Sequence, residues 1–297
     1  MTEDPKRIVV SWGELLWDLF PKERRLGGCA GNVAVHLARL GVQSRLVTRI
    51  GNDAFGTEAI ARLSALDVDV RLVQRDPSRP TGTVRVELVD GEPSFFIATE
   101  AAWDAIEWTP QVADAIASAN VLYYGTLAQR TPLGSGALAQ AWGATKPDCL
   151  RVCDVNLRAP LPKRAVIEAS LVAADAIKVN ESELGFVGQA FGVSDPAAWL
   201  IREHGVRLVA VTLGNRGSVL HRSDVSVSHP GFPARSEEGD PVGAGDAFTA
   251  VLCNALARRE GFGHPDELYR LAERANRIAS YVASRPGATP RLPGSLV

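Results

Sequence analysis

The sequence predicts an α/β fold, built on a mainly parallel sheet that helices cover on both faces. Three observations predict it: short apolar, β-branched runs recur along the chain, helix-length amphipathic segments lie between them, and 297 residues suffice for one large core. Strands and helices that alternate in this way form βαβ units with parallel strands. We find no internal repeat and no low-complexity tract in the sequence.

The expected strands share short length, apolar character and many β-branched residues. They cover residues 8–10, 45–50, 121–125, 150–155, 176–179 and 207–213. The clearest helix covers residues 31–40, where Val33, Leu37 and Leu40 share one face and Gly41 follows as a stop signal. Further helices are expected at residues 55–66, 132–142 and 163–173.

One stretch departs from this alternation and predicts a β-hairpin. Residues 83–88 alternate between apolar and polar side chains, Asp90 and Gly91 form a turn signal, and residues 94–98 supply a second strand. The hairpin is either an extra edge of the main sheet or part of a small β lid that folds over a ligand.

Composition and charge exclude several classes of protein. With 46% hydrophobic and 22% charged residues, the chain is neither disordered nor fibrous. The formal net charge of −2 gives no electrostatic reason to bind nucleic acid or a membrane surface. No apolar run approaches the roughly 18 residues of a membrane helix, and the residues after Met1 do not form a signal peptide. We therefore expect a soluble, cytoplasmic protein.

Cysteine usage agrees with this expectation. Cys29, Cys149, Cys153 and Cys253 stand among apolar or small residues, without a CxxC pair. No two histidines have the spacing of metal ligands. We expect buried or semi-buried reduced thiols rather than a zinc site or a disulfide framework.

A glycine-rich segment that ends in Asp246 is the most informative stretch for function. Three small residues, Gly243, Ala244 and Gly245, directly precede the next expected helix. That helix covers residues 247–256, and free backbone N–H groups at its N-terminus favour an anion. Asp246 is either a capping acid or a base that accepts a hydroxyl proton during phosphoryl transfer. The chain contains no P-loop, and no GxGxxG follows a strand, which argues against a nicotinamide-dependent dehydrogenase.

This segment resembles the DTxGAGD signature of the ribokinase-like (PfkB-type) carbohydrate kinases. Segments similar to other motifs of that family follow in the same order along the chain: its first sugar-binding strand, GGxxxN, DxNxR, NxxE, TxGxxG and the C-terminal helix and loop. They lie at residues 13–18, 27–32, 154–158, 180–183, 212–217 and 280–290. The stretches GELLWDLFP, GTLAQR, AWD and DVNLR are most similar to the fructokinase-like branch.

The resemblance implies a ribokinase-like three-layer fold with a central, mainly parallel sheet and a small β-sheet lid. The whole chain, residues 1–297, would form a single carbohydrate kinase domain. The lid would come from about residues 12–26 and 81–98 and would close over the sugar.

The resemblance also implies an activity, which is transfer of the terminal phosphoryl group of ATP to a primary hydroxyl of a small sugar. Asp246 would be the catalytic base. Gly243, Ala244 and Gly245 would supply the anion hole through their backbone amides. Arg158 would contact the phosphate during transfer, with an ordinary surface arginine as the alternative.

Residues near the N-terminus would bind the sugar. Asp18 would accept hydrogen bonds from hydroxyls, and Gly27 and Gly28 would let the backbone approach the ring. Asn32 would donate and accept hydrogen bonds, and Cys29 lies between these residues. The alternatives are a solvated turn acid for Asp18 and a plain N-cap for Asn32.

The nucleotide and Mg²⁺ would lie further along the chain. Asn180 and Glu183 would organise Mg²⁺ through its waters, and the alternative is that Glu181 and Glu183 are solvated acids at a helix start. The implied nucleotide-binding residues are Asn180, Thr212, Gly214, Gly217 and Asn276, the last near the adenine.

A monovalent cation is a further implication. Its ligands would be mostly backbone carbonyls, at Asp240, Val242, Val282, Arg285 and Gly287. The last usual ligand falls on Arg291, whose guanidinium would repel or replace the cation. Pro241 also stands where the family usually has Thr, so both departures argue against K⁺ dependence.

Fructose is the first expected substrate, fructose 6-phosphate the product, and a homodimer the expected assembly. One alternative is a kinase for another polyol, such as ribose, 2-keto-3-deoxygluconate, a nucleoside or tagatose 6-phosphate. Another is a non-catalytic sugar or nucleotide sensor, against which Asp246 argues because a pure binder needs no base.

Overall fold

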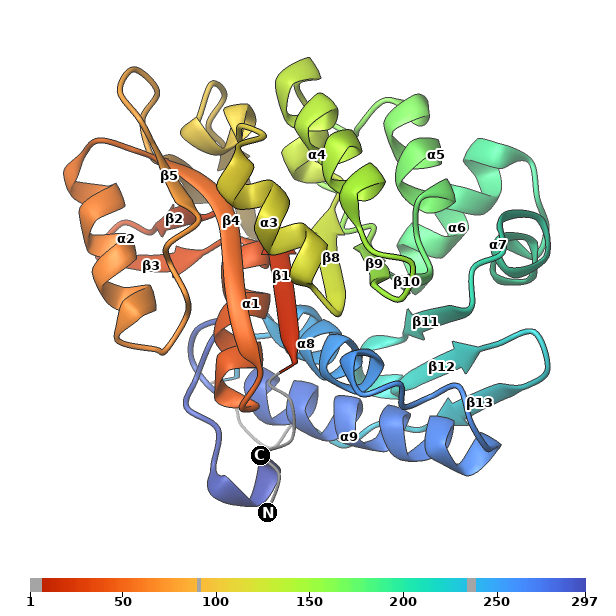
Figure 1. Cartoon of the computed structure of the whole chain (residues 1–297). Coiled ribbons are helices and arrows are strands. Elements are labelled where there is room, and N and C mark those ends of the chain that lie inside the picture. Colours follow the sequence, from red (N-terminus) through yellow and green to blue (C-terminus); the bar gives the residue numbers. More distant parts are fainter. Residues whose placement is uncertain (1–6, 90–91, 234–238) are drawn as a thin grey trace, which may run out of the picture.

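The computed structural model describes residues 7–89, 92–233 and 239–297, and it has the predicted α/β architecture (Figure 1). A nine-stranded sheet has the order β13-β12-β11-β10-β9-β8-β1-β4-β5. Neighbours from β11 to β5 pair in parallel, while β12 and β13 are antiparallel at one edge. The predicted mainly parallel central sheet is therefore confirmed.

The strands of this sheet are β1 (Ile8–Trp12), β4 (Gln43–Gly51), β5 (Val73–Asp76), β8 (Val121–Gly125), β9 (Leu150–Asp154), β10 (Ala176–Asn180), β11 (Leu208–Thr212), β12 (Ser218–His221) and β13 (Ser226–His229). The helices are α1 (Cys29–Arg39), α2 (Ala54–Ser64), α3 (Pro110–Ser118), α4 (Pro132–Ala144), α5 (Arg164–Val172), α6 (Glu181–Phe191), α7 (Pro196–His204), α8 (Ala244–Ala257) and α9 (Pro265–Ala283). Short 3₁₀ turns are η1 (Ala102–Ala105), η2 (Leu127–Gln129), η3 (Gly214–Arg216) and η4 (Gly294–Leu296). Every predicted strand and helix is present within three residues of its expected ends.

Helices cover both faces of the sheet. Helices α1, α8 and α9 lie on one face and α3 to α7 on the other (Figure 1). Val9 and Val10 are adjacent in β1, yet each belongs to a different apolar cluster, one against α1, α8 and α9 and the other against α3 to α7. Successive residues of a strand point to opposite faces, so a strand buried on both sides must be apolar throughout.

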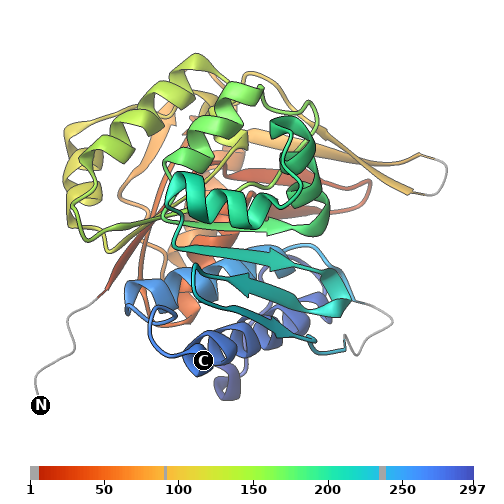
Figure 2. The ribbon, with the colours of Figure 1, turned by 90° about the vertical axis from the view of Figure 1, so that its right-hand side faces the viewer.

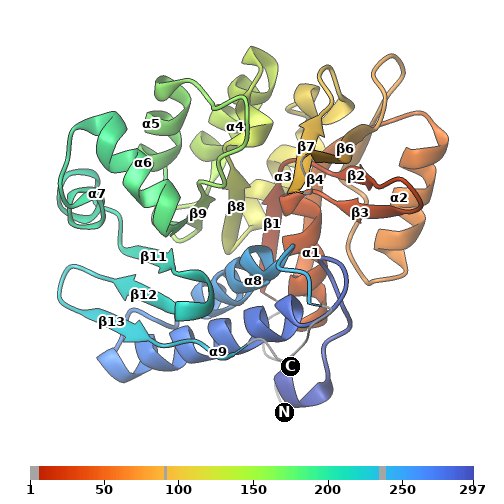
Figure 3. The same ribbon diagram turned by 180° about the vertical axis from the view of Figure 1, so that it is seen from behind.

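A second, smaller sheet stands beside the first. Its strands β2 (Leu16–Leu19), β3 (Arg24–Gly27), β6 (Gly82–Val89) and β7 (Glu92–Ile97) have the order β3-β2-β6-β7, with a parallel β2–β6 pair between two antiparallel pairs (Figure 3). The β6–β7 hairpin projects from the body of the molecule (Figure 2). The predicted hairpin thus belongs to the small sheet and not to an edge of the main one.

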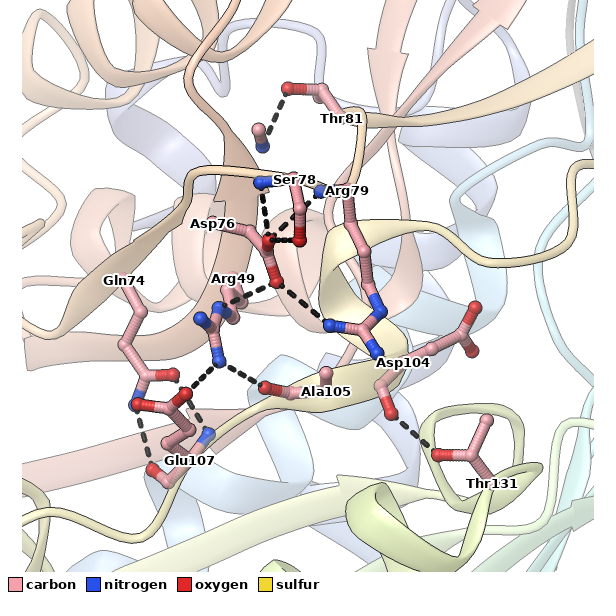
Figure 4. A network of polar contacts seen from close by, with 11 residues as sticks. Arg49, Gln74, Asp76, Ser78, Arg79, Thr81, Asp104, Ala105, Glu107 and Thr131 are labelled. Carbon is pink, nitrogen blue, oxygen red and sulfur yellow. Dashed lines mark hydrogen bonds and ion pairs between the residues drawn. The ribbon is translucent and has the colours of Figure 1, made fainter.

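A polar network fixes the segment that leads from β5 into β6 (Figure 4). The buried Asp76 carboxylate accepts hydrogen bonds from the backbone N–H groups of Ser78, at 2.9 Å, and Arg79, at 2.8 Å. The Nε atom of Arg49 lies 3.1 Å from Asp76 Oδ2. Burial alone would raise the pKa of Asp76, but these bonds and the Arg49 charge hold it well below the ordinary carboxyl value.

Within residues 7–89, 92–233 and 239–297, no helix is both long enough and apolar enough to cross a membrane.

Candidate active site

A cavity of about 580 Å³ opens where the central parallel strands end, and the small sheet contributes to its wall. Carboxyl ends of parallel strands are the usual place for ligands in open α/β sheets. The predicted site residues that line this cavity are Asp18, Gly28, Asn32, Arg158, Asn180, Glu183, Thr212, Val242, Gly243, Gly245 and Asp246. The N-terminal sugar motifs and the C-terminal glycine turn therefore meet at one cavity.

The glycine turn forms the start of α8. Gly243 is the N-cap with φ of 83°, a left-handed conformation that favours glycine. A Cβ atom on Gly243 would also lie 2.5 Å from Cα of Ala288, so the C-terminal loop leaves no room for a side chain. Gly245 and Asp246 follow in the first turn, where the helix N-terminus presents unpaired N–H groups. The turn thus has the geometry of an anion site beside a carboxylate.

Asp246 is buried, and its carboxylate points into the cavity. Asn32, one turn into α1, donates from Nδ2 to Asp246 Oδ2 at 2.8 Å. The N-cap of α1 is Gly28, so Asn32 is not the capping residue. Burial is the largest cause that raises the pKa of Asp246, the Asn32 amide opposes it, and the nearby Asp154 charge raises it further. A carboxylate with a raised pKa is a stronger base for a hydroxyl proton.

Lys178 is a charged residue of the cavity that the sequence analysis did not assign. It is buried in β10, lines the cavity, and its Nζ lies 3.2 Å from Asp154 Oδ1. The same ammonium would lie 3.2 Å from a Cβ atom on Gly245. Burial alone would lower the pKa of Lys178, but Asp154, Glu183 and Asp246 raise it above the usual value, so the side chain stays charged. A lysine between the apolar residues Ile177 and Val179 of β10 was the available signal.

Asp18 lines the cavity from β2 of the small sheet. It is partly buried rather than a solvated turn acid, and burial raises its pKa to about 6 while the Arg25 guanidinium opposes the shift. A Cβ atom on Gly27 would lie 2.5 Å from Asp18 Oδ2, so this glycine makes room for the carboxylate. Gly28 has φ of 95°, and a Cβ atom there would lie 2.5 Å from the Glu14 carbonyl oxygen.

Three further side chains line the same end of the cavity. Glu14, which is buried, accepts a hydrogen bond from the Cys29 backbone N–H at 3.1 Å. Asn156 donates from Nδ2 to the Cys29 sulfur. Burial raises the pKa of Cys29 well above its usual value, so this thiol stays protonated. These contacts position Cys29 as a neutral part of the wall.

Glu183 lines the cavity and also caps α6. Its Oε2 accepts a hydrogen bond from the Asn180 backbone at 2.8 Å, its Oε1 accepts one from Leu157 at 3.0 Å, and Asn180 Oδ1 accepts one from the Glu183 N–H at 2.8 Å. Burial and the Asp154 charge raise the pKa of Glu183. Glu181, in contrast, is exposed and pairs with Arg216. Arg158 is exposed at the cavity mouth and donates to the Leu157 carbonyl.

Three of the predicted nucleotide residues, Gly214, Gly217 and Asn276, are not among the residues that line this cavity. Thr212 lines it, whereas Gly214 and Gly217 belong to the turn around η3. A Cβ atom on Gly217 would lie 2.6 Å from the carbonyl carbon of Pro230, so this glycine permits close packing of two loops. Asn276 is buried in α9 and donates from Nδ2 to Ser218 Oγ and to the Ala272 carbonyl, both at 2.7 Å.

The predicted monovalent-cation positions lie near the start of α8 and the end of α9. The Asp240 carboxylate already has partners, since Arg25 Nη1 lies 2.9 Å from Oδ2 and the Val242 N–H donates to Oδ1 at 3.0 Å. The Val282 carbonyl accepts a hydrogen bond from the Arg285 backbone. Gly287 lines a separate cavity of about 360 Å³ with Arg25. The one carboxylate among these positions, that of Asp240, is thus bound by the Arg25 guanidinium.

Comparison with known proteins decides the family. Residues 19–294 match the model of the pfkB family carbohydrate kinases. The chain belongs to this family. It is therefore a carbohydrate kinase, and the predicted family membership is confirmed.

Two solved structures and one further relative agree with the pfkB assignment. The protein named "Probable fructokinase-2" from Arabidopsis thaliana is 30% identical over 98% of this chain and 94% of that protein. A sugar kinase from Pyrococcus horikoshii in complex with ATP is 31% identical with a TM-score of 0.79, over 95% of each chain. A double mutant of Vibrio cholerae fructokinase, in a form with fructose, ADP and potassium bound, is 25% identical with a TM-score of 0.83, over 99% of this chain and 98% of that one. These likenesses confirm the ribokinase-like fold and the fructokinase-like branch.

Proposed function

We propose that this kinase transfers the γ-phosphoryl group of ATP to a primary hydroxyl of a small sugar, with fructose as the first candidate and fructose 6-phosphate as the product. The observation that carries the proposal is the 2.8 Å hydrogen bond between Asn32 and Asp246. It joins the sugar motif of α1 to the glycine turn of α8 at one cavity, although 214 positions separate them in sequence.

Asp246 acts as the general base. Its carboxylate accepts the hydroxyl proton while the sugar oxygen attacks the γ-phosphorus, and the bond to the bridging oxygen of ADP breaks. The Asn32 amide holds one carboxylate oxygen and so orients the other toward the cavity. Burial raises the pKa of Asp246, which favours its role as the proton acceptor.

Charge on the transferring phosphoryl group is stabilised by the start of α8 and by Lys178. The backbone N–H groups of Gly243 and Gly245 supply fixed donors, whereas the predicted third donor, the Ala244 N–H, donates to the Pro241 carbonyl at 3.2 Å. The Lys178 ammonium lies beside Gly245 and adds a full positive charge in a buried setting, where electrostatic interactions are strong. Arg158 reaches the same cavity from the exposed side and guides the phosphate during transfer.

The chemistry of the carboxylates fits a hydrated Mg²⁺ ion. Asp154, Glu183 and Asp246 are buried near one another, and the Asp154 charge raises the pKa of the other two. A divalent cation would relieve this repulsion, and Mg²⁺ keeps several waters while it takes one or two carboxylates. Glu183 and Asn180 would hold it through water, and the ion would neutralise charge on the nucleotide phosphates.

The sugar binds between α1 and the small sheet. Asp18 accepts hydrogen bonds from adjacent hydroxyls, and the backbone at Gly28 contacts the ring, while Gly27 lines the neighbouring cavity and makes room for the Asp18 carboxylate. Leu16, Val84 and Ile97 of the small sheet form an apolar part of the cavity wall, which supports its proposed role as a lid that excludes water. Fructose is the first candidate because the relatives include fructokinases.

Several expectations from the sequence are retained as proposals. The single-domain boundaries, the cytoplasmic location and the nucleotide roles of Gly214, Gly217 and Asn276 stay predictions. A homodimer through the small sheets is proposed because Phe96 of β7 is 53% exposed there.

A substrate panel tests this proposal. Purified enzyme with ATP and Mg²⁺ is given hexoses, pentoses, keto acids and nucleosides in a coupled assay of ADP release, and NMR of the product identifies the phosphorylated hydroxyl. We expect the highest kcat/KM for fructose, phosphorylated at C6. Preference for another polyol would correct the substrate alone, whereas ADP release that no sugar accelerates would contradict the kinase proposal.

A further inference from the structure

Two residues of α1 hold the C-terminal loop, residues 286–291. His36 Nε2 lies 3.0 Å from the Ala288 carbonyl oxygen, and the histidine is fully buried. Arg39 donates from Nη1 to the Thr289 carbonyl at 2.6 Å and to the Pro290 carbonyl. Three successive carbonyls are thus bound by side chains that lie about 250 positions away in sequence.

The C-terminal loop packs closely against the start of α8. A Cβ atom on Gly243 would lie 2.5 Å from Cα and 2.7 Å from the carbonyl carbon of Ala288. Gly243 is the N-cap of α8 and the first residue of the anion hole. A shift of the loop would therefore move Gly243 and change the positions of the backbone N–H groups at the start of α8. Figure 3 shows the C-terminal segment running beside α1 and α8.

The positively charged guanidinium of Arg39 interacts with these carbonyl oxygens and, among the described residues, not with a carboxylate. Among the ion pairs of residues 7–89, 92–233 and 239–297, none includes Arg39. Burial and the neighbouring Arg291 charge lower the pKa of Arg39, and the Thr289 and Pro290 carbonyls compensate part of its half-buried charge. Backbone carbonyls around a single positive charge are also the type of ligand that a bound monovalent cation uses.

We propose that Arg39 is a positioning residue for phosphoryl transfer, whose guanidinium serves as an internal cation that holds the C-terminal loop against Gly243. The inference rests on the proposed function, because it assigns Arg39 to the anion hole of that reaction. His36 adds an uncharged hydrogen bond to the same loop. The Arg25 guanidinium pairs with Asp240, which precedes Gly243 in the same turn.

The test uses Arg39→Met, Arg39→Lys and the matched control Arg71→Gln, an exposed arginine paired with Asp69. We expect Arg39→Met to lower kcat by about tenfold or more, with the KM for sugar within about twofold, since Asp18 and Asn32 are untouched. Arg39→Lys should retain an intermediate kcat because it keeps the charge and loses the planar fork. The control should match the wild type.

Rescue of the Arg39→Met variant by an added cation distinguishes a positioning role of Arg39 from a general contribution to stability. Guanidinium chloride at sub-denaturing concentration should raise the kcat of Arg39→Met and leave the wild type unchanged, with K⁺ as a second cation in parallel assays. Rescue by either cation supports the inference. An unchanged kcat in Arg39→Met, or a loss that neither cation restores and that follows the fall in melting temperature, would overturn it.

A second readout does not depend on activity. Hydrogen–deuterium exchange of the peptides that cover residues 243–247 and 286–291 should rise in Arg39→Met and stay unchanged in Arg71→Gln. Unchanged exchange at residues 243–247 would refute the positioning role even if the enzyme proved inactive toward every sugar. Raised exchange together with an inactive wild type would instead keep the mechanical link and reject the proposed reaction.

Discussion

We predict that Gly243→Ala and Gly245→Ala both lower turnover, but that only Gly243→Ala lowers the stability of the fold. A methyl group on Gly245 meets one neighbour, the Lys178 ammonium, at 3.2 Å. Gly245 lies in the first turn of α8 and has no positive φ. A methyl group on Gly243 meets the backbone of Ala288 at 2.5 Å, and Gly243 has φ of 83°.

The magnitudes follow from these contacts. An ordinary carbon contact is about 3.5–4.0 Å, so Gly245→Ala displaces the Lys178 ammonium by about half an ångström. Because a misplacement of about 1 Å can cost about a hundredfold in rate, we expect kcat to fall by roughly tenfold. Alanine is favoured over glycine in a helix by about 0.5–1 kcal/mol, so the melting temperature should stay equal or rise. In Gly243→Ala the left-handed conformation alone costs about 1–2 kcal/mol, and the clash with the loop adds to it.

The assay pairs ADP release under saturating substrates with a thermal melt followed by circular dichroism. Gly245→Ala should lose turnover at an unchanged or higher melting temperature, while Gly243→Ala should lose both. Full activity in Gly245→Ala would show that neither this turn nor the Lys178 ammonium sits where the phosphoryl group passes, and it would refute the reasoning.

Three further predictions concern single groups. The pKa of Asp18 is about 6, so sugar affinity should fall as the pH drops through 6, and titration calorimetry with Asp18→Asn as control checks this. Over the same range this group's contribution to folding stability should rise because its folded pKa exceeds the unfolded one, and urea unfolding of the wild type and Asp18→Asn checks that sign. The pKa of His36 is about 4, below the unfolded value, so about 3 kcal/mol of stability should be lost between pH 6.5 and 4, and urea unfolding of His36→Gln should lack this loss. Lys178→Met should lower the free energy of unfolding by about 3–5 kcal/mol, because it leaves Asp154 buried without its partner. The double variant Lys178→Met with Asp154→Asn should restore the free energy of unfolding but not turnover.

The sequence predicted the central strands because periodicity reports burial. Strands such as β8, Val121–Gly125, are apolar throughout, and that pattern follows from burial on both faces. The edge strands β12 and β13 were missed because their sequences, SVLH and SVSH, are short and half polar. Helix α3 was missed although Thr109 caps it and Pro110 is its first residue, both of which are start signals of a helix.

The sequence motifs predicted which residues belong to the candidate site, but not which of them contact one another. The spacing of the glycine turn indicated an anion site and a neighbouring base, and the structure brings Asp246 into the cavity. The distance between Asn32 and Asp246 depends on the packing of α1 against α8, which no local pattern encodes. Lys178 and Arg39 were not assigned for the same reason, since their partners come from other elements of the fold.

Asp246→Asn is the most direct test of the central claim, that a buried carboxylate beside the α8 amides deprotonates the sugar. Asparagine keeps an oxygen that can accept the hydrogen bond from Asn32, so the cavity should survive. We expect kcat to fall by roughly 10²–10⁴-fold, with sugar affinity by titration calorimetry within about threefold of the wild type. Turnover near the wild-type value, or an equal loss of sugar binding and turnover, would contradict the account.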